Sequence, residues 1–69
     1  MIVNVANTLS LTHAARKKAE TTDDAQLAQQ LVDAADTVAS ALVLNLNDET
    51  AVLRPEVGRR VAFLTENYK

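Results

Sequence analysis

Residues 23–43 read DDAQLAQQLVDAADTVASALV and carry the longest amphipathic pattern of the chain. At helical spacing the apolar residues of this stretch fall on one arc, and its polar residues fill the opposite face. Residues 21–24 precede the pattern with hydroxyl and carboxylate side chains, which suit the N-terminus of a helix. The stretch therefore predicts a central helix over residues 23–43.

The apolar arc of this predicted helix is about 200° wide, whereas a surface helix needs a stripe of only roughly 100°. A helix with so wide an arc has to contact neighbours on two sides. Because a chain of 69 residues has room for only a thin core, we expect another subunit to cover part of the arc. The predicted partner interface on this helix consists of Leu27, Leu31, Val38 and Leu42.

A second amphipathic pattern follows toward the C-terminus and predicts a helix over residues 54–68. Its apolar positions recur at spacings of four, three and four residues, which places them on one stripe. Pro55 suits the first turn, where the missing N–H needs no helical partner. The stripe consists of Val57, Val61, Leu64 and Tyr68.

The N-terminal third has the weakest pattern. A short helix is predicted over residues 10–20, where Leu11 and three alanines share a face that Lys18 interrupts. Residues 1–9 have too little apolar mass to pack unaided and are expected to form an extended arm.

These elements predict an all-α fold with a single small domain over residues 1–69. Helices 23–43 and 54–68 are expected to pack as an antiparallel hairpin. The shorter helix 10–20 is expected to cover the second side of the central helix.

An α+β fold is the alternative. From Leu42 the sequence LVLNLN alternates between apolar and polar residues, and turn-forming residues follow before Ala51-Val52-Leu53. This pattern is compatible with a β-hairpin over residues 42–54, to which Val3 and Val5 could add a third strand.

The residues needed for catalysis or metal binding are almost absent. The chain has no Cys and one His, His13, which lies on the polar side of a weak helix beside Ser10. Between Asn45 and Glu56 the oxygen-bearing residues match a calcium loop poorly, because Thr50 stands where such a loop needs Gly. We therefore expect no enzymatic activity, no catalytic residues, no metal and no cofactor.

Two basic clusters give the alternative function, a small nucleic-acid-binding regulator. They consist of Arg16, Lys17 and Lys18, and of Arg59 and Arg60. Acidic residues flank both clusters, no aromatic residue is interleaved to stack on bases, and the net charge is −2. Protein is therefore the expected partner, in preference to nucleic acid.

Phe63 is the residue that most strongly suggests a protein partner. It falls off the apolar stripe of helix 54–68, beside Arg59 and, if the helix extends backward, Val52. An aromatic residue next to Arg on a polar surface is typical of an interface anchor. Phe63, Arg59 and Val52 thus complete the predicted partner interface.

The chain is therefore predicted to be a structural or interaction protein, a small subunit of a homo-oligomer or a larger assembly. A viral particle component and a small accessory protein are both compatible with this prediction. No apolar run reaches the ~20 residues that cross a bilayer, and no secretory leader pattern precedes the first helix. A location in the cytoplasm or within a viral particle, without secretion or membrane contact, is expected.

Overall fold

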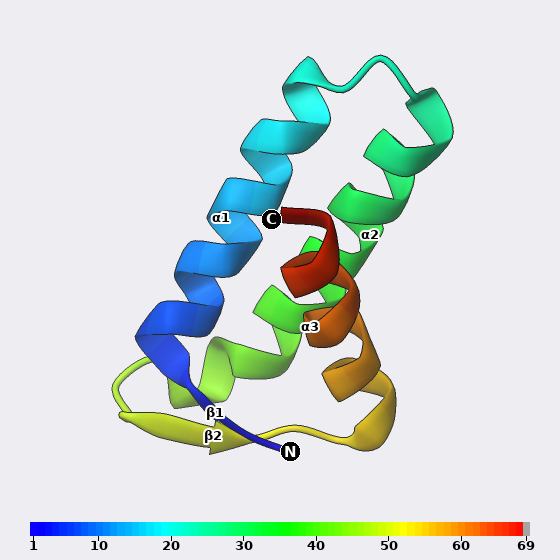
Figure 1. The fold of residues 1–69 in the computed structure, drawn as a ribbon. Helices are drawn as coiled ribbons and strands as arrows, with labels where there is room; N and C mark the ends of the chain where they lie inside the picture. Colours follow the sequence, from blue (N-terminus) through cyan, green and yellow to red (C-terminus); the bar gives the residue numbers. More distant parts are fainter. Residues whose placement is uncertain (69) are drawn as a thin grey trace.

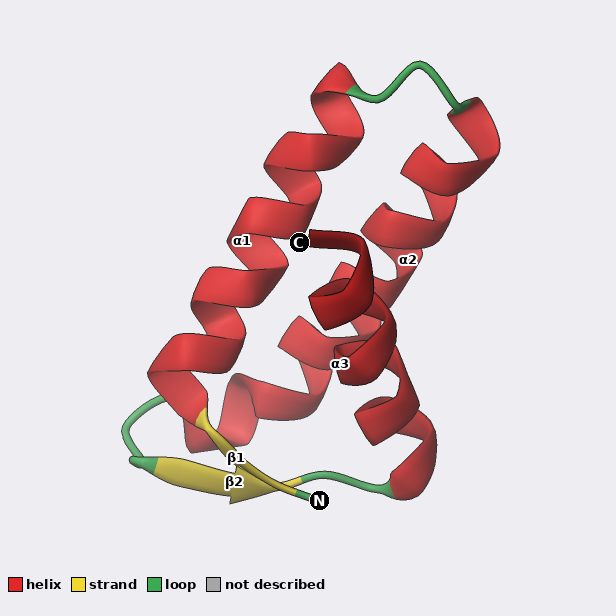
Figure 2. Cartoon of the chain, viewed as in Figure 1, coloured by secondary structure: helices red, strands yellow, loops and turns green. Residues whose placement is uncertain are grey.

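The computed structural model describes the backbone of residues 1–68 and the side chains of residues 1–67. Over this part the chain is mostly helical, with a small two-stranded sheet at one end (Figures 1 and 2). In chain order the elements are β1 (Ile2–Asn4), α1 (Val5–Thr21), α2 (Ala25–Leu42), the single 3-10 turn η1 (Val43–Asn45), β2 (Thr50–Val52) and α3 (Pro55–Tyr68). The predicted mostly helical fold is confirmed.

Helix α2 corresponds to the predicted central helix and begins at a side-chain cap. Asp24 Oδ1 accepts hydrogen bonds from the backbone N–H of Gln26 at 3.0 Å and of Leu27 at 3.1 Å. These bonds satisfy two amides that have no partner within the helix. The buried side of α2 consists of Leu31, Ala34, Ala35, Val38 and Leu42.

Replacement of this cap tests its contribution to stability. We expect Asp24→Ala to lower the free energy of unfolding by about 0.5–2 kcal/mol, because two N-terminal amides of α2 lose their acceptor. Asp23→Ala is the matched control, since Asp23 is exposed and precedes the cap. Urea titration followed by circular dichroism measures both variants, and equal losses would contradict a specific role for Asp24.

Helix α1 is longer than predicted, because it begins at Val5 and not near residue 10. The Asn4 side chain accepts a hydrogen bond from the Asn7 N–H at 2.9 Å, which caps the helix there. The buried positions Thr8 and Thr12 donate their hydroxyls to the carbonyls of Asn4 and Leu9, both at 2.7 Å. Because these buried positions are polar, the first turns of α1 show no apolar periodicity in the sequence. The predicted extended arm over residues 1–9 is therefore wrong beyond Asn4.

The N-terminal strand β1 pairs antiparallel with β2, which follows α2 and η1 in the chain. Their register places Ile2 opposite Val52, Val3 opposite Ala51, and Asn4 opposite Thr50. The alternative β-hairpin over 42–54 is therefore wrong: residues 43–45 form η1, and the strand partner of β2 is the N-terminal segment. The alternative also gave Val3 and Val5 a place in a strand. Val3 does lie in β1, whereas Val5 begins α1.

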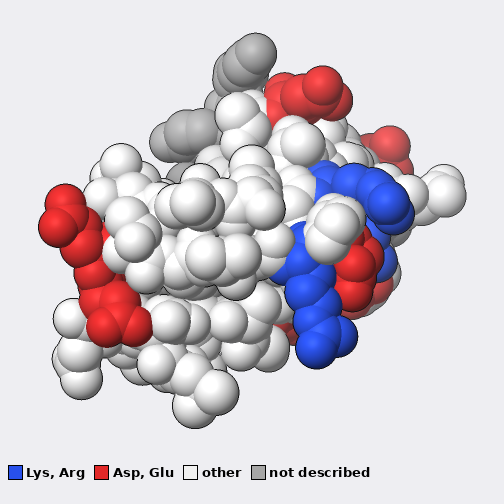
Figure 3. Space-filling view, turned by 90° about the horizontal axis from the view of Figure 1, so that it is seen from below, with Lys and Arg blue, Asp and Glu red and all other residues white. Residues whose placement is uncertain are grey.

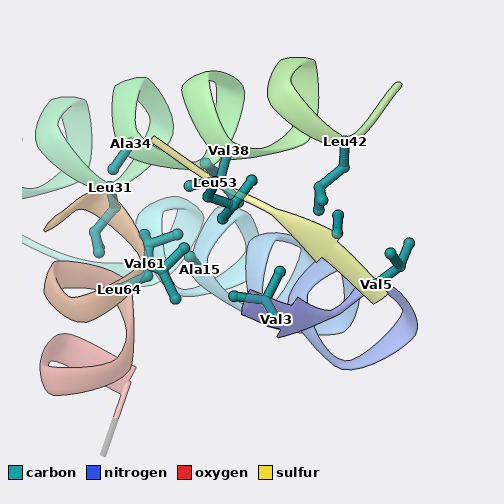
Figure 4. Packing of buried hydrophobic residues seen from close by; sticks show 12 residues of the cluster. Val3, Val5, Ala15, Leu31, Ala34, Val38, Leu42, Leu53, Val61 and Leu64 are labelled. Atoms are coloured by element: carbon teal, nitrogen blue, oxygen red, sulfur yellow. The ribbon is translucent and has the colours of Figure 1, made fainter. Parts of the chain in front are cut away.

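Helices α1 and α2 form the main antiparallel pair, and α3 lies across both (Figure 1). The predicted pairing of 23–43 with 54–68 as the principal hairpin is wrong in this respect, because the long α1 packs along more of α2 than α3 does. The sheet closes the end of the core at the C-terminus of α2. Figure 4 shows the core side chains, of which the largest fully buried ones are Leu31, Leu42, Leu64 and Val38.

Candidate functional site

The large exposed apolar side chains of the described residues gather at the sheet end of the molecule. They come from β1 and the residue before it, from η1 and the turn after it, and from β2. Leu44 is 93% exposed, Val52 78% and Ile2 73%. We call the set the sheet-end surface; it consists of Met1, Ile2, Val43, Leu44, Leu46 and Val52.

The alternation of the two strands builds one part of this surface. Side chains of successive strand residues point to opposite faces, so Val3, Ala51 and Leu53 enter the core. Ile2 and Val52 lie directly opposite each other and point outward. The outer face of the sheet therefore carries an aliphatic pair next to the polar pair Asn4 and Thr50.

The 3-10 turn builds the other part of the surface. After the fully buried Leu42, the chain leaves the helical phase and turns Val43 and Leu44 outward. The Asn45 amide donates to Asp48 Oδ2 at 2.9 Å, and the Asp48 N–H donates to the Asn45 carbonyl at 3.0 Å. The polar residues of the turn are thus bonded to each other, while its aliphatic side chains face the solvent.

Charged residues border the sheet end on two sides. Figure 3 views this end from below and shows acidic residues at one edge, basic and acidic residues side by side near the opposite edge, and uncharged residues between the two groups. Along the chain, Asp48 and Glu49 directly precede β2, and Arg54 follows it closely. The uncharged surface is therefore bordered by acidic residues on one side and by residues of both charges on the other.

The predicted interface on the central helix lies mostly inside the molecule. Leu31 is 1% exposed, and Val38 and Leu42 are fully buried within their own chain. Leu27 is half-buried and packs against the same core. The prediction that these residues meet a partner is therefore wrong for the three buried ones, because α1, α3 and the sheet cover the wide apolar arc.

Phe63 and Val52, which were predicted to lie together, occupy different parts of the fold. Val52 belongs to β2 and is the one predicted interface residue on the sheet-end surface. Phe63 is half-buried against the core and lines a groove between α2 and α3. The other residues lining this groove are Gln30, Asp33, Ala34, Arg59 and Arg60.

The two basic clusters do not form one surface. Arg16 bonds Asp36 at 2.7 Å along the groove between α1 and α2. The Lys18 ammonium donates to the Asn67 carbonyl at the end of α3, while Lys17 is exposed. Arg60 lies in the other groove, between α2 and α3. Helix α2 thus separates Arg16 from Arg60, which is unfavourable for a shared phosphate-binding surface.

The residues of possible catalytic or metal-binding character are dispersed within residues 1–68. His13 and Ser10 are both exposed on α1. In this part of the chain no three His, Asp or Glu side chains converge as metal ligands would. None of the described helices combines the length and apolar character that a membrane span requires.

Comparisons with known proteins add no functional information. No protein-family model matches the chain, and neither the curated proteins nor the solved structures contain a significant match. The function is therefore argued from the sheet-end surface. Sequence reasoning missed most of this surface. Its signal was Leu44, directly after the predicted helix 23–43, because continuing the helical pattern would place this leucine on the polar face.

Proposed function

We propose that the protein is a non-enzymatic interaction protein that binds another protein through its sheet-end surface, as a subunit of a homo-oligomer or a larger assembly. The observation that supports this proposal is the concentration of six large exposed apolar side chains at one end of a small chain. Large exposed apolar side chains gathered on one part of a protein's surface mark interaction sites. A viral particle or an accessory complex as the setting stays a prediction from the sequence.

The physical reason is the free energy of removing these side chains from water. Fully burying a Leu or Val side chain contributes roughly 1.5–3 kcal/mol, and the sheet-end surface holds several that are more than half exposed. The described residues of the chain leave them exposed. Contact with the surface of a second protein would remove these side chains from water.

Site-specific cross-linking in the producing cells tests this function. A photoreactive benzoylphenylalanine replaces Leu44 in one variant and Thr37 in the control, which is exposed on α2 away from the sheet. We expect a discrete cross-linked protein from position 44 and none from position 37. Circular dichroism verifies that both variants are folded.

A second variant in the same assay tests whether Leu44 contributes to the contact that position 52 reports. Leu44→Asn is combined with the photoreactive residue at position 52, in place of Val52, and is expected to weaken the product formed from that position. The Thr37→Asn change is the matched control for it. If positions 44 and 52 give no discrete product, or the same products as position 37, the proposed function is wrong.

A further inference from the structure

The backbone of β2 presents one open edge. Met1 and Leu53 exchange two hydrogen bonds, at 2.7 and 3.1 Å, and the Val5 N–H donates to the Glu49 carbonyl at 3.0 Å. In an antiparallel ladder such bonded pairs alternate with pairs whose N–H and C=O groups point away from the partner strand. The backbone groups of Thr50 and Val52 therefore point away from β1.

No other described element pairs with this edge. The sheet contains β1 and β2 only, and β1 is the element that packs along β2. The outer edge of β1 is different, because α1 follows it directly and the Asn4 carbonyl accepts the Thr8 hydroxyl. The strand Thr50–Val52 also lacks the Pro and Lys residues with which exposed edges commonly discourage pairing.

The charges at the two ends of β2 favour one occupant for the edge. Resting on the proposed function, we propose that β2 pairs antiparallel with β2 of a second copy of this chain across a two-fold axis. The register that uses the outward groups of both residues in each copy places Thr50 of one copy opposite Val52 of the other. In that register Asp48 of each copy lies opposite Arg54 of the other, so the symmetric pairing creates two attractive charge pairs.

The sequence around β2 carries unlike charges at its two ends, because Asp48 and Glu49 precede the strand and Arg54 follows it. A two-fold axis between two β2 strands therefore places the acidic end of one copy beside the basic end of the other. The pairing also extends a two-stranded ribbon, which is marginal on its own, to four strands. Ile2 and Val52 then belong to one continuous outer face with their counterparts.

Charge exchange at this interface is the test. Sedimentation equilibrium over a range of concentrations is expected to show a monomer–dimer equilibrium for the unmodified chain. Asp48→Arg alone, or Arg54→Asp alone, places like charges opposite each other twice and is expected to weaken the dimer about tenfold. An equimolar mixture of the two variants is expected to restore association, because only the mixed dimer has opposite charges at both pairs.

The strand edge itself is tested by Val52→Pro. This change removes an outward N–H and leaves the β1 pairing intact. We therefore expect circular dichroism to show a folded chain and sedimentation equilibrium to show a monomer. A chain that is monomeric at every concentration overturns self-pairing, and so does a dimer that ignores both the charge changes and Val52→Pro. In either case the cross-linking from position 44 still decides the proposed function, because a product with a different protein supports it without self-pairing.

Discussion

Leu42→Ala should lower the free energy of unfolding by about 2–5 kcal/mol, a large part of what holds so small a domain together. Leu42 is fully buried at the last turn of α2, where Figure 4 shows its side chain directed into the core near the sheet. Truncation removes apolar contacts and leaves a cavity that the surrounding helices and strands cannot fill completely. The result is a stability loss and not merely weaker association.

Leu44→Ala is the matched control for this prediction. The substitution is chemically identical and lies two residues away, but Leu44 is 93% exposed. We expect its free energy of unfolding to stay within about 0.5 kcal/mol of the unmodified chain. Urea titration at a protein concentration where the chain is monomeric separates the two effects. Similar losses for both variants would mean that η1 is packed into the fold, contrary to the exposure of Leu44.

The elements that the sequence predicted well have strong local signals. Helix 23–43 matches α2 (Ala25–Leu42) because a complete cap precedes an uninterrupted apolar arc. Helix 54–68 matches α3 (Pro55–Tyr68), which Pro55 starts and a regular stripe maintains. In both cases short-range physics determines the element, so no knowledge of the rest of the fold was needed.

The elements that were missed depend on hydrogen bonds or on distant partners. In α1 the buried positions Thr8 and Thr12 are polar, and their hydroxyls are satisfied by carbonyls of the preceding turn. The strand pairing of Ile2–Asn4 with Thr50–Val52 joins segments that are far apart in sequence. Alternation within 42–47 suggested a local hairpin, whereas the structure uses these residues for η1 and a turn.

The partner interface was predicted from the wide apolar arc of the central helix, on the assumption that a second subunit covers it. The wide arc of the central helix does need several neighbours, and α1, α3 and the sheet supply them from the same chain. The apolar residues left without cover are those that break the helical phase after Leu42 and those on the outer sheet face. The exposure of Ile2 and Val52 depends on strand register, which the local pattern does not contain.

The close contact of α1 with α2 leads to the second large effect. Ala15 of α1 and Ala35 of α2 are almost completely buried, with Ala35 fully so. Because alanines leave little space between two helices that pack side by side, a larger side chain has no room there (Figure 1). Ala35→Leu is therefore expected to force the helices apart.

We expect Ala35→Leu to lower the free energy of unfolding by about 1–3 kcal/mol, although leucine is more apolar than alanine and nearly as good a helix former. Ala41→Leu is the control, because Ala41 is exposed on the same helix and its replacement meets no packed neighbour. Thermal unfolding should show a lower midpoint for Ala35→Leu, by about 4–8 °C per kcal/mol in a domain of this size, and little change for Ala41→Leu. If Ala35→Leu were neutral or stabilising, α1 and α2 would have to lie farther apart than their buried alanines indicate, and the wide apolar arc of α2 would still have room for a partner.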